Sequence, residues 1–174
     1  MPSTYTLIAS NVLSSSAASV TFSAIPSTYT DLVLRISART DKVGTNDDYK
    51  LTFNNLTTTI YSGTTVEGFS TTASSIRTTG YAYAGVTTTI DAANNTANTF
   101  ASLEFYIPSY TASQNKPFSS IEAQEANSTT QVTQAAIAHL FRSTAAINSL
   151  KFEVGTGPNF VSGSSFYLYG ISKS

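Results

Sequence analysis

The sequence predicts an all-β protein, a single antiparallel β-sandwich of the jelly-roll type that spans residues 1–174. Three observations support this fold class. Apolar and polar residues alternate along much of the chain, as in strands with one buried face. Serine and threonine supply 54 of the 174 residues and only 11% of the residues are charged, so long charged helices are not expected. Turn-forming residues recur at about every 10–15 positions, which suits short strands in a sandwich.

The strands of the first half follow from this alternation. The clearest lies at 31–39, where Leu32, Leu34 and Ile36 share one face and Arg35 lies on the other. Threonine-rich stretches between the apolar positions fit pleated surfaces, because threonine is β-branched. In chain order, the expected strands of this half lie at 4–9, 20–22, 31–39, 50–54 and 76–83.

The second half continues the pattern up to the C-terminus. Leu103, Phe105 and Ile107 alternate with polar residues before Pro108 stops the strand. Residues 131–142 are rich in alanine and are the one stretch compatible with a helix. We expect a strand there, because the segment is short, has no capping residue and is surrounded by strands. The expected strands of this half lie at 103–107, 118–125, 131–142, 150–154 and 166–170.

Residues 55–100 differ in composition from the rest of the chain. They carry three charged residues, Glu67, Arg77 and Asp91, among many threonines, serines, glycines and alanines. The composition is compatible with long loops, with an extended hairpin that projects from the sandwich, or with further surface strands.

Three tyrosines are the candidate contact residues. Tyr167 and Tyr169 lie opposite Phe166 and Leu168 on the last strand, and Tyr106 lies opposite the apolar face of its own strand. A strand that is apolar or aromatic on both faces must be covered on both sides. Tyrosine is favoured at protein interfaces because it combines a large area with a polar tip. The cover is another subunit or partner, a loop of the same chain, or a sugar that stacks on the rings.

The sequence contains no recognisable catalytic motif. His139 is the single histidine and lies within an expected strand, where we interpret it as a structural residue rather than as part of a Ser-His-Asp triad. No pair of acids stands in a recognisable motif. We therefore expect no enzyme activity, no catalytic residue, no cofactor and no metal ligand. The acidic segment from Asp41 to Asp48 offers hard oxygen atoms that suit Ca²⁺, but Asx-rich turns are also common between strands.

Charge and hydropathy exclude two classes of partner. Nine basic residues against ten acidic residues give a net charge of −1, which argues against a nucleic-acid-binding protein. No apolar run approaches the roughly 18 residues of a membrane-spanning helix, so we expect no membrane contact. The chain has no cysteine, and a disulfide framework is therefore ruled out.

Several segments resemble a known group of proteins: 19–39, 100–109, and in the C-terminal part 143–154 and 159–171. They are similar to small β-sandwich structural proteins of tailed-bacteriophage virions, whereas 55–98 fits poorly. The resemblance implies a capsid decoration (cement) protein on the outer capsid surface, with the major capsid protein and further copies of itself, as a homotrimer, for partners. The alternative it implies is a tail- or fibre-associated glycan-binding adhesin module. The shared residues are strand and turn positions, so the resemblance assigns no functional residue.

Overall fold

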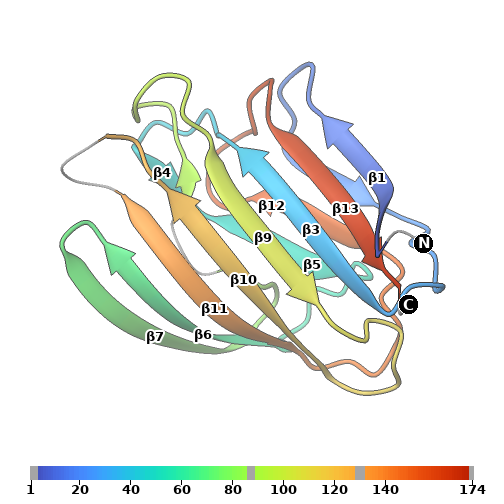
Figure 1. The fold of residues 1–174 in the computed structure, drawn as a ribbon. Coiled ribbons are helices and arrows are strands. Elements are labelled where there is room, and N and C mark those ends of the chain that lie inside the picture. The colour runs from blue at the N-terminus through green and yellow to red at the C-terminus, as the bar shows by residue number, and fades with distance from the viewer. Residues whose placement is uncertain (1–3, 86–88, 128–131, 173–174) are drawn as a thin grey trace.

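The fold is described from a computed structural model, which covers residues 4–85, 89–127 and 132–172 (Figure 1). Within these ranges the regular elements are all β-strands. The described residues contain no helix that is long and apolar enough to cross a membrane. The strands are β1 (Tyr5–Val12), β2 (Ser19–Phe22), β3 (Asp31–Ala38), β4 (Asn46–Asp47), β5 (Tyr49–Phe53), β6 (Tyr61–Phe69), β7 (Thr72–Tyr81), β8 (Ile90–Asp91), β9 (Ala101–Ile107), β10 (Lys116–Gln124), β11 (Thr133–Phe141), β12 (Leu150–Val154) and β13 (Ser165–Ile171).

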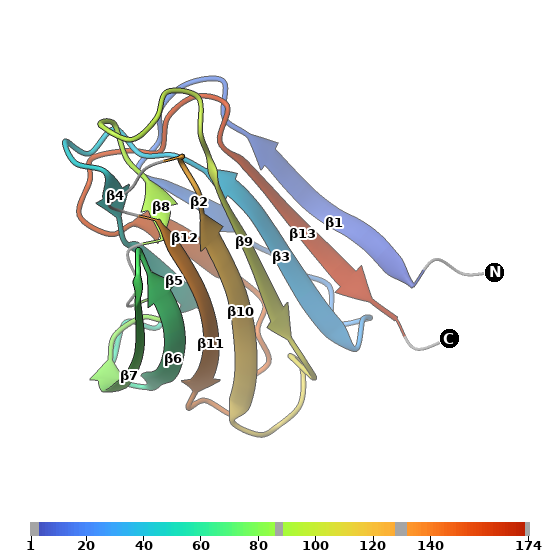
Figure 2. The same ribbon diagram turned by 60° about the vertical axis from the view of Figure 1, so that its left-hand side comes forward.

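The strands form two facing antiparallel sheets of unequal size. The large sheet has eight strands in the order β1-β13-β3-β9-β10-β11-β6-β7, and the small sheet has three in the order β2-β12-β5. Figure 2 shows the small sheet lying against one side of the large sheet. A short two-stranded sheet, β4-β8, lies beyond the small sheet. The antiparallel β-sandwich predicted from the sequence is therefore confirmed.

The core lies between the two sheets and is built by the predicted alternation. Leu34 on β3 and Phe105 on β9 point inward, and both are fully buried. They meet Leu51 of β5 and Phe152 of β12 in one apolar cluster. Burial of each such side chain stabilises the fold by about 1.5–3 kcal/mol relative to an exposed position.

Within 131–142, Thr133–Phe141 form a strand, as predicted. In β11, Ala135, Ile137 and Phe141 are buried while Ala136 and Ala138 are exposed, which is the period-two pattern of a strand. Gln131 lies outside the described residues. The small alanine side chains permit a helix by propensity, but pairing with β10 and β6 on both sides determines the strand.

The described part of 55–100 extends the large sheet. Strands β6 and β7 form a hairpin that is closed by the two residues Ser70 and Thr71, and β6 pairs with β11. The backbone φ of Ser70 is 52°, which places this residue in the left-handed region that hairpin turns require. Strand β7 is the last strand of the sheet and is exposed along most of both faces.

Candidate interaction surface

The three predicted contact residues lie together on the outer side of the large sheet. We call the outward-facing residues of this sheet the open face. The strand register places Leu7 beside Tyr169, Tyr169 beside Val33, and Val33 beside Tyr106. Tyr167 lies two residues before Tyr169 on the same face of β13. Residues from four strands, β1, β13, β3 and β9, thus form one continuous row.

Tyr106 is held in place by a carboxylate at the end of β3. Its side chain is 40% exposed, and its hydroxyl donates a hydrogen bond of 2.8 Å to Oδ2 of Asp31. The same carboxylate accepts the backbone N–H of Ser109 through Oδ1 at 2.8 Å. The bond to Asp31 raises the pKa of the Tyr106 phenol, because the carboxylate holds the phenolic proton. The ring is therefore oriented before any partner binds.

Tyr169 packs against both an aromatic ring and a cation. The ring of Tyr5 meets it edge-on at a centroid distance of 6.5 Å, and the Arg35 guanidinium lies 5.9 Å from its centroid. Arg35 in turn binds Glu104 at 2.7 Å between Nε and Oε2. This ion pair is exposed, so its contribution to stability is small, but it fixes the two charges beside the aromatic row.

Tyr167 lines a shallow groove on the same face. The groove has a volume of about 260 Å³ and contains Arg35, Glu104 and the serines Ser37, Ser102 and Ser165. A phenol ring beside hydroxyl and charged groups offers both stacking and hydrogen bonding to a small polar ligand.

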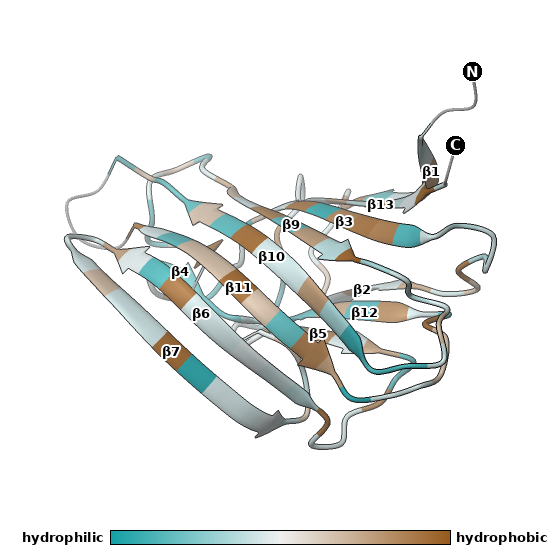
Figure 3. Cartoon of the chain, turned by 60° about the horizontal axis from the view of Figure 1, so that its bottom comes forward, coloured by the Kyte–Doolittle hydropathy of each residue, from teal (hydrophilic) through white to brown (hydrophobic). Residues whose placement is uncertain are grey.

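The open face carries no charge over β10, β11 and β6. The outward residues of β10, β11 and β6 are small, polar-neutral or apolar, and the register aligns Ile121, Ala136 and Val66 in one row. Ile121 is 57% exposed and Val66 is 62% exposed. Figure 3 shows brown and paler residues alternating along β10 and β11. The sequence gives no sign that Ile121 and Val66 share a surface, because each stands alone between polar residues.

Exposure along the open face differs from strand to strand. The outward positions of β9, β10 and β11 are exposed in strict alternation with buried ones, apart from Leu140 near the end of β11, which is half-buried. In the tyrosine row, Tyr106 is 40% exposed, Tyr167 and Tyr169 are half-buried, and Val33 is 2% exposed. Over β9, β10 and β11, a loop from the described part of this chain is therefore not observed as a cover.

His139 lies in the interior, in a polar network that sequence analysis did not find. Its ring stacks on Phe118 at 4.6 Å, and its Nε2 lies 3.0 Å from Oγ of Ser120. Ser120 donates to Oε1 of Glu122 at 2.7 Å, and Thr89 donates to Oε2 at 2.6 Å. Tyr49 also donates its hydroxyl to Glu122.

The geometry of this network differs from a catalytic triad. In a triad the acid binds the histidine and the histidine binds the serine. Here Ser120 lies between His139 and Glu122, so the histidine has no acid to orient it. The hydroxyl proton of Ser120 is donated to Glu122, so Ser120 accepts the hydrogen bond that it shares with His139. Nε2 of His139 is therefore protonated and is the donor of that bond. Burial lowers the pKa of His139 to about 4, so the ring is neutral at pH 7.

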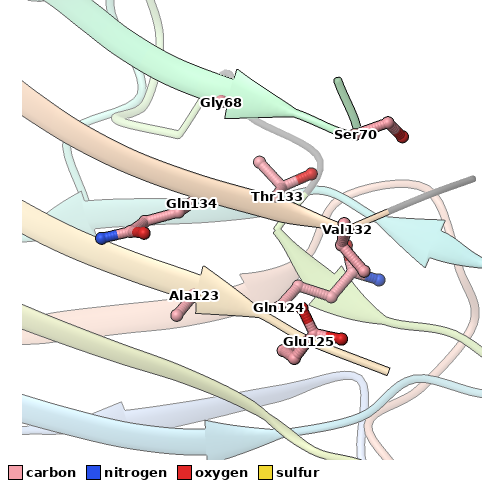
Figure 4. Close-up of a pocket in the computed structure, with 8 residues that line it drawn as sticks. All are labelled: Gly68, Ser70, Ala123, Gln124, Glu125, Val132, Thr133 and Gln134. Atoms are coloured by element: carbon pink, nitrogen blue, oxygen red, sulfur yellow. The ribbon is translucent and has the colours of Figure 1, made fainter. Parts of the chain in front are cut away.

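A pocket of about 290 Å³ lies where β6 and β10 end and β11 begins (Figure 4). Its wall includes Gly68, Ala123 and Gln134, which are exposed, and Gln124 and Thr133, which are buried. The Gln124 amide donates to the backbone oxygen of Thr45 at 3.0 Å and to Oδ1 of Asp91 at 3.2 Å. Gln124 therefore ties β10 to the β4-β8 region.

The acidic segment that begins at Asp41 binds protein donors. Asp47 is fully buried and accepts hydrogen bonds from Thr156 and from the backbone N–H of Gly157. Asp41 accepts the backbone N–H and the side-chain amide of Asn159 at 2.8 and 3.0 Å. These carboxylates thus anchor the turn that follows β12, and the described residues hold no group of three or more potential metal-ligating side chains.

We expect calcium to have no effect on stability. Binding of Ca²⁺ at this loop would require Asp41 and Asp47 to release hydrogen bonds that the fold already uses. The melting temperature, measured by circular dichroism, should be the same with excess Ca²⁺ and with a chelator. A rise in melting temperature with Ca²⁺ that Asp47→Asn abolishes would contradict this reading of the loop.

Comparisons with known proteins give only distant similarities. No protein family and no curated protein matches the chain. An alginate lyase from Chlorella virus is 10% identical, with a TM-score of 0.26, over 86% of this chain and 76% of the lyase. Botulinum neurotoxin type C is 8% identical, with a TM-score of 0.22, over 95% of this chain and 44% of the other. A chain of infectious bursal disease virus, Gt strain, is 14% identical, with a TM-score of 0.15, over 95% of this chain and 42% of the other.

One prediction from the sequence is corrected by these comparisons. The absence of a recognisable motif predicted that the chain is not an enzyme, yet the alginate lyase among the similar structures is an enzyme. The exclusion of enzymatic function is therefore withdrawn. A missing motif shows only that no familiar arrangement of residues is present, and TM-scores this low assign no reaction, ligand or partner to this chain.

Proposed function

We propose that this chain is a virion structural protein of a tailed bacteriophage, a capsid decoration protein that binds the assembled head. The observation that carries the proposal is the open face with its row of tyrosines, in which Tyr106 is 40% exposed and Tyr167 and Tyr169 are half-buried. The resemblance of 19–39, 100–109, 143–154 and 159–171 to phage β-sandwich proteins supports the same role. The partner is the major capsid protein, and the location is the outer surface of the head.

The size of the open face suits a protein interface. Eight strands about 4.8 Å apart, each seven to ten residues long, span roughly 1,100 Å². One partner contributes about 800 Å² to an interface of standard size. Aromatic residues with polar groups around them are the usual anchors of such an interface.

Binding to the assembled shell explains how such a protein would act. A protein that binds the closed shell and not its separated subunits stabilises the shell by mass action. Many copies on one particle, gathered as trimers around local three-fold positions, make modest individual contacts sufficient. Cryo-electron microscopy of decorated shells is expected to show three copies around each occupied position.

Replacing Tyr106, Tyr167 and Tyr169 together with serine should abolish binding to purified shells. Loss of the rings removes the largest side chains of the row and leaves the buried core unchanged. Co-sedimentation of the protein with shells that lack it measures the effect. Tyr81, on the distant strand β7, provides the matched control, and Tyr81→Ser should bind as the wild type does. Wild-type binding by the folded triple variant would overturn the assignment of this face.

A glycan-binding adhesin module of a tail or fibre is the second candidate. The groove beside Tyr167 favours it, because hydroxyl and charged side chains surround an aromatic ring. Screening against a glycan array tests this role. Binding that Tyr167→Ala removes, together with no binding to shells, would replace the decoration proposal.

A further inference from the structure

Strand β7 (Thr72–Tyr81) is an unusually open edge of the large sheet. It is ten residues long and, among the described residues, pairs on one side only, with β6. Its residues are exposed along most of both faces, so neither the small sheet nor another described segment packs over it. An edge strand of this kind presents a row of unpaired backbone donors and acceptors to any further strand.

The two edges of the large sheet differ in how they are protected. The opposite edge strand, β1, pairs with β13 through a ladder that is irregular between Leu7 and Ala9. Such a bulge twists an edge away from further pairing. The ladder of β7 with β6 is regular from Thr72 to Thr79 and becomes irregular only near Tyr81. Strand β7 contains no proline and a single charged residue, Arg77, so it lacks the usual protecting devices.

The turn geometry determines which backbone groups of β7 are free. In a hairpin closed by a two-residue turn, the pair that flanks the turn exchanges backbone hydrogen bonds, and bonded pairs then alternate along the ladder. The flanking pair here is Phe69 and Thr72. Ile76 lies four residues after Thr72, so its backbone N–H and C=O groups also bond to β6. The residues whose N–H and C=O groups point away from β6 are Ala73, Ser75, Arg77 and Thr79.

We propose that β7 pairs antiparallel with β7 of a second copy of this chain, about a two-fold axis at Ile76. Symmetric pairing must place residues of the same hydrogen-bonding type opposite each other. An axis at Arg77 would place two arginines directly opposite, which is unfavourable. An axis at Ile76 places two isoleucines opposite, each 40% exposed in the single chain, and sets Arg77 against Ser75.

The remaining pairs of this register place no like charges opposite each other. On the face that carries Ile76, Ser74 lies opposite Thr78 of the second copy, and each keeps the hydrogen bond that it donates within its own chain, to Glu67 and to the backbone oxygen of Gly63. The pairing buries part of an exposed apolar side chain and satisfies the free backbone groups of both copies. Pairing of β7 with β1 of another copy is disfavoured by the irregular ladder of β1. The large sheets of the two copies are then joined at their β7 edges and form one continuous sheet.

This contact is independent of the proposed shell-binding face. Tyr167 and Tyr169 lie on β13, next to β1, at the other end of the sheet from β7. Both surfaces can be occupied at once. Either proposal can fail without the other.

Cysteine cross-linking tests the register directly, because the chain has no cysteine of its own. Opposite residues in a pair without hydrogen bonds have Cα atoms about 4.5 Å apart, within the range of a disulfide. Under mild oxidation, Ile76→Cys should therefore form a covalent dimer. Ser74→Cys alone and Thr78→Cys alone should stay monomeric on a non-reducing gel, and a mixture of these two should cross-link. The proposal would be overturned if all three single variants cross-linked equally, or if Ile76→Cys formed no covalent dimer.

A proline at position 75 provides a second, non-covalent test. The Ser75 N–H points away from β6, so Ser75→Pro removes a donor from the free edge and leaves the β6 ladder intact. Sedimentation should show a dimer of the wild type at high protein concentration and a folded monomer of Ser75→Pro. A wild type that stays monomeric, or a folded Ser75→Pro variant that dimerises as the wild type does, would show that the edge is not the contact.

Discussion

Replacing Phe152 with alanine is expected to lower the free energy of unfolding by about 3–5 kcal/mol, as for other large-to-alanine changes in cores. Phe152 is 1% exposed, on the middle strand of the small sheet. Its ring stacks on Tyr49 at 4.9 Å, contacts Phe160 at 5.7 Å and meets Phe105 of the large sheet at 6.1 Å. Truncation would open a cavity at the point where the two sheets meet, and these rings are too constrained to fill it.

Urea unfolding followed by circular dichroism measures this loss. Ile121→Ala provides the control, because Ile121 is exposed on the open face and its truncation should change stability by no more than about 0.5 kcal/mol. If Phe152→Ala cost no more than Ile121→Ala, the packing of the small sheet on the large sheet would be disproved.

Lowering the pH from 6.5 to 4 should destabilise the protein through His139 by about 3 kcal/mol. Burial lowers the pKa of His139 to about 4 in the folded state, whereas the unfolded chain has the ordinary value of 6.5. Between these values the unfolded chain binds a proton that the folded chain does not. Acid therefore favours unfolding, and the loss begins below pH 6.5 and is complete below pH 4.

The difference between wild type and His139→Gln isolates this contribution. Glutamine retains a neutral N–H donor for Ser120 and does not titrate. Urea unfolding at a series of pH values should show a wild-type stability that falls relative to the variant between pH 6.5 and 4. Asp48 and Asp91 have pKa values raised by burial, so they act in the opposite direction, but they are common to both proteins. A difference that does not change with pH would show that His139 is solvated in the folded state.

Strand β10 shows where sequence patterning stops being informative. Its inward residues include Ser120, Glu122 and Gln124, whereas Ile121 points outward. Hydropathy alone assigns Ile121 to the inside of the sheet and the three polar residues to the outside. The inversion arises because this part of β10 faces polar groups rather than apolar side chains. The hydroxyls of Tyr49, on β5 of the small sheet, and of Thr89 satisfy the buried carboxylate of Glu122.

The tyrosine row shows the reverse case. Period two alone placed Tyr106, Tyr167 and Tyr169 opposite the core face of their strands, and all three lie on the open face. Their neighbours in space were not predictable. Leu7 is 162 positions from Tyr169 in the chain, and only the pairing of β1 with β13 brings the two together. The contact of Tyr106 with Asp31 depends in the same way on the pairing of β3 with β9.

The sequence by itself determined the all-β class, the strand nature of 133–141 and the outward direction of the three tyrosines. These follow from local alternation, because successive side chains of a strand point to opposite faces. The tertiary structure alone decided the strand order, the unequal division into eight and three strands, the polar network around Glu122 and the free edge at β7. Each of these depends on which strands pair across long separations, and the alternation within a strand carries no information about its neighbours.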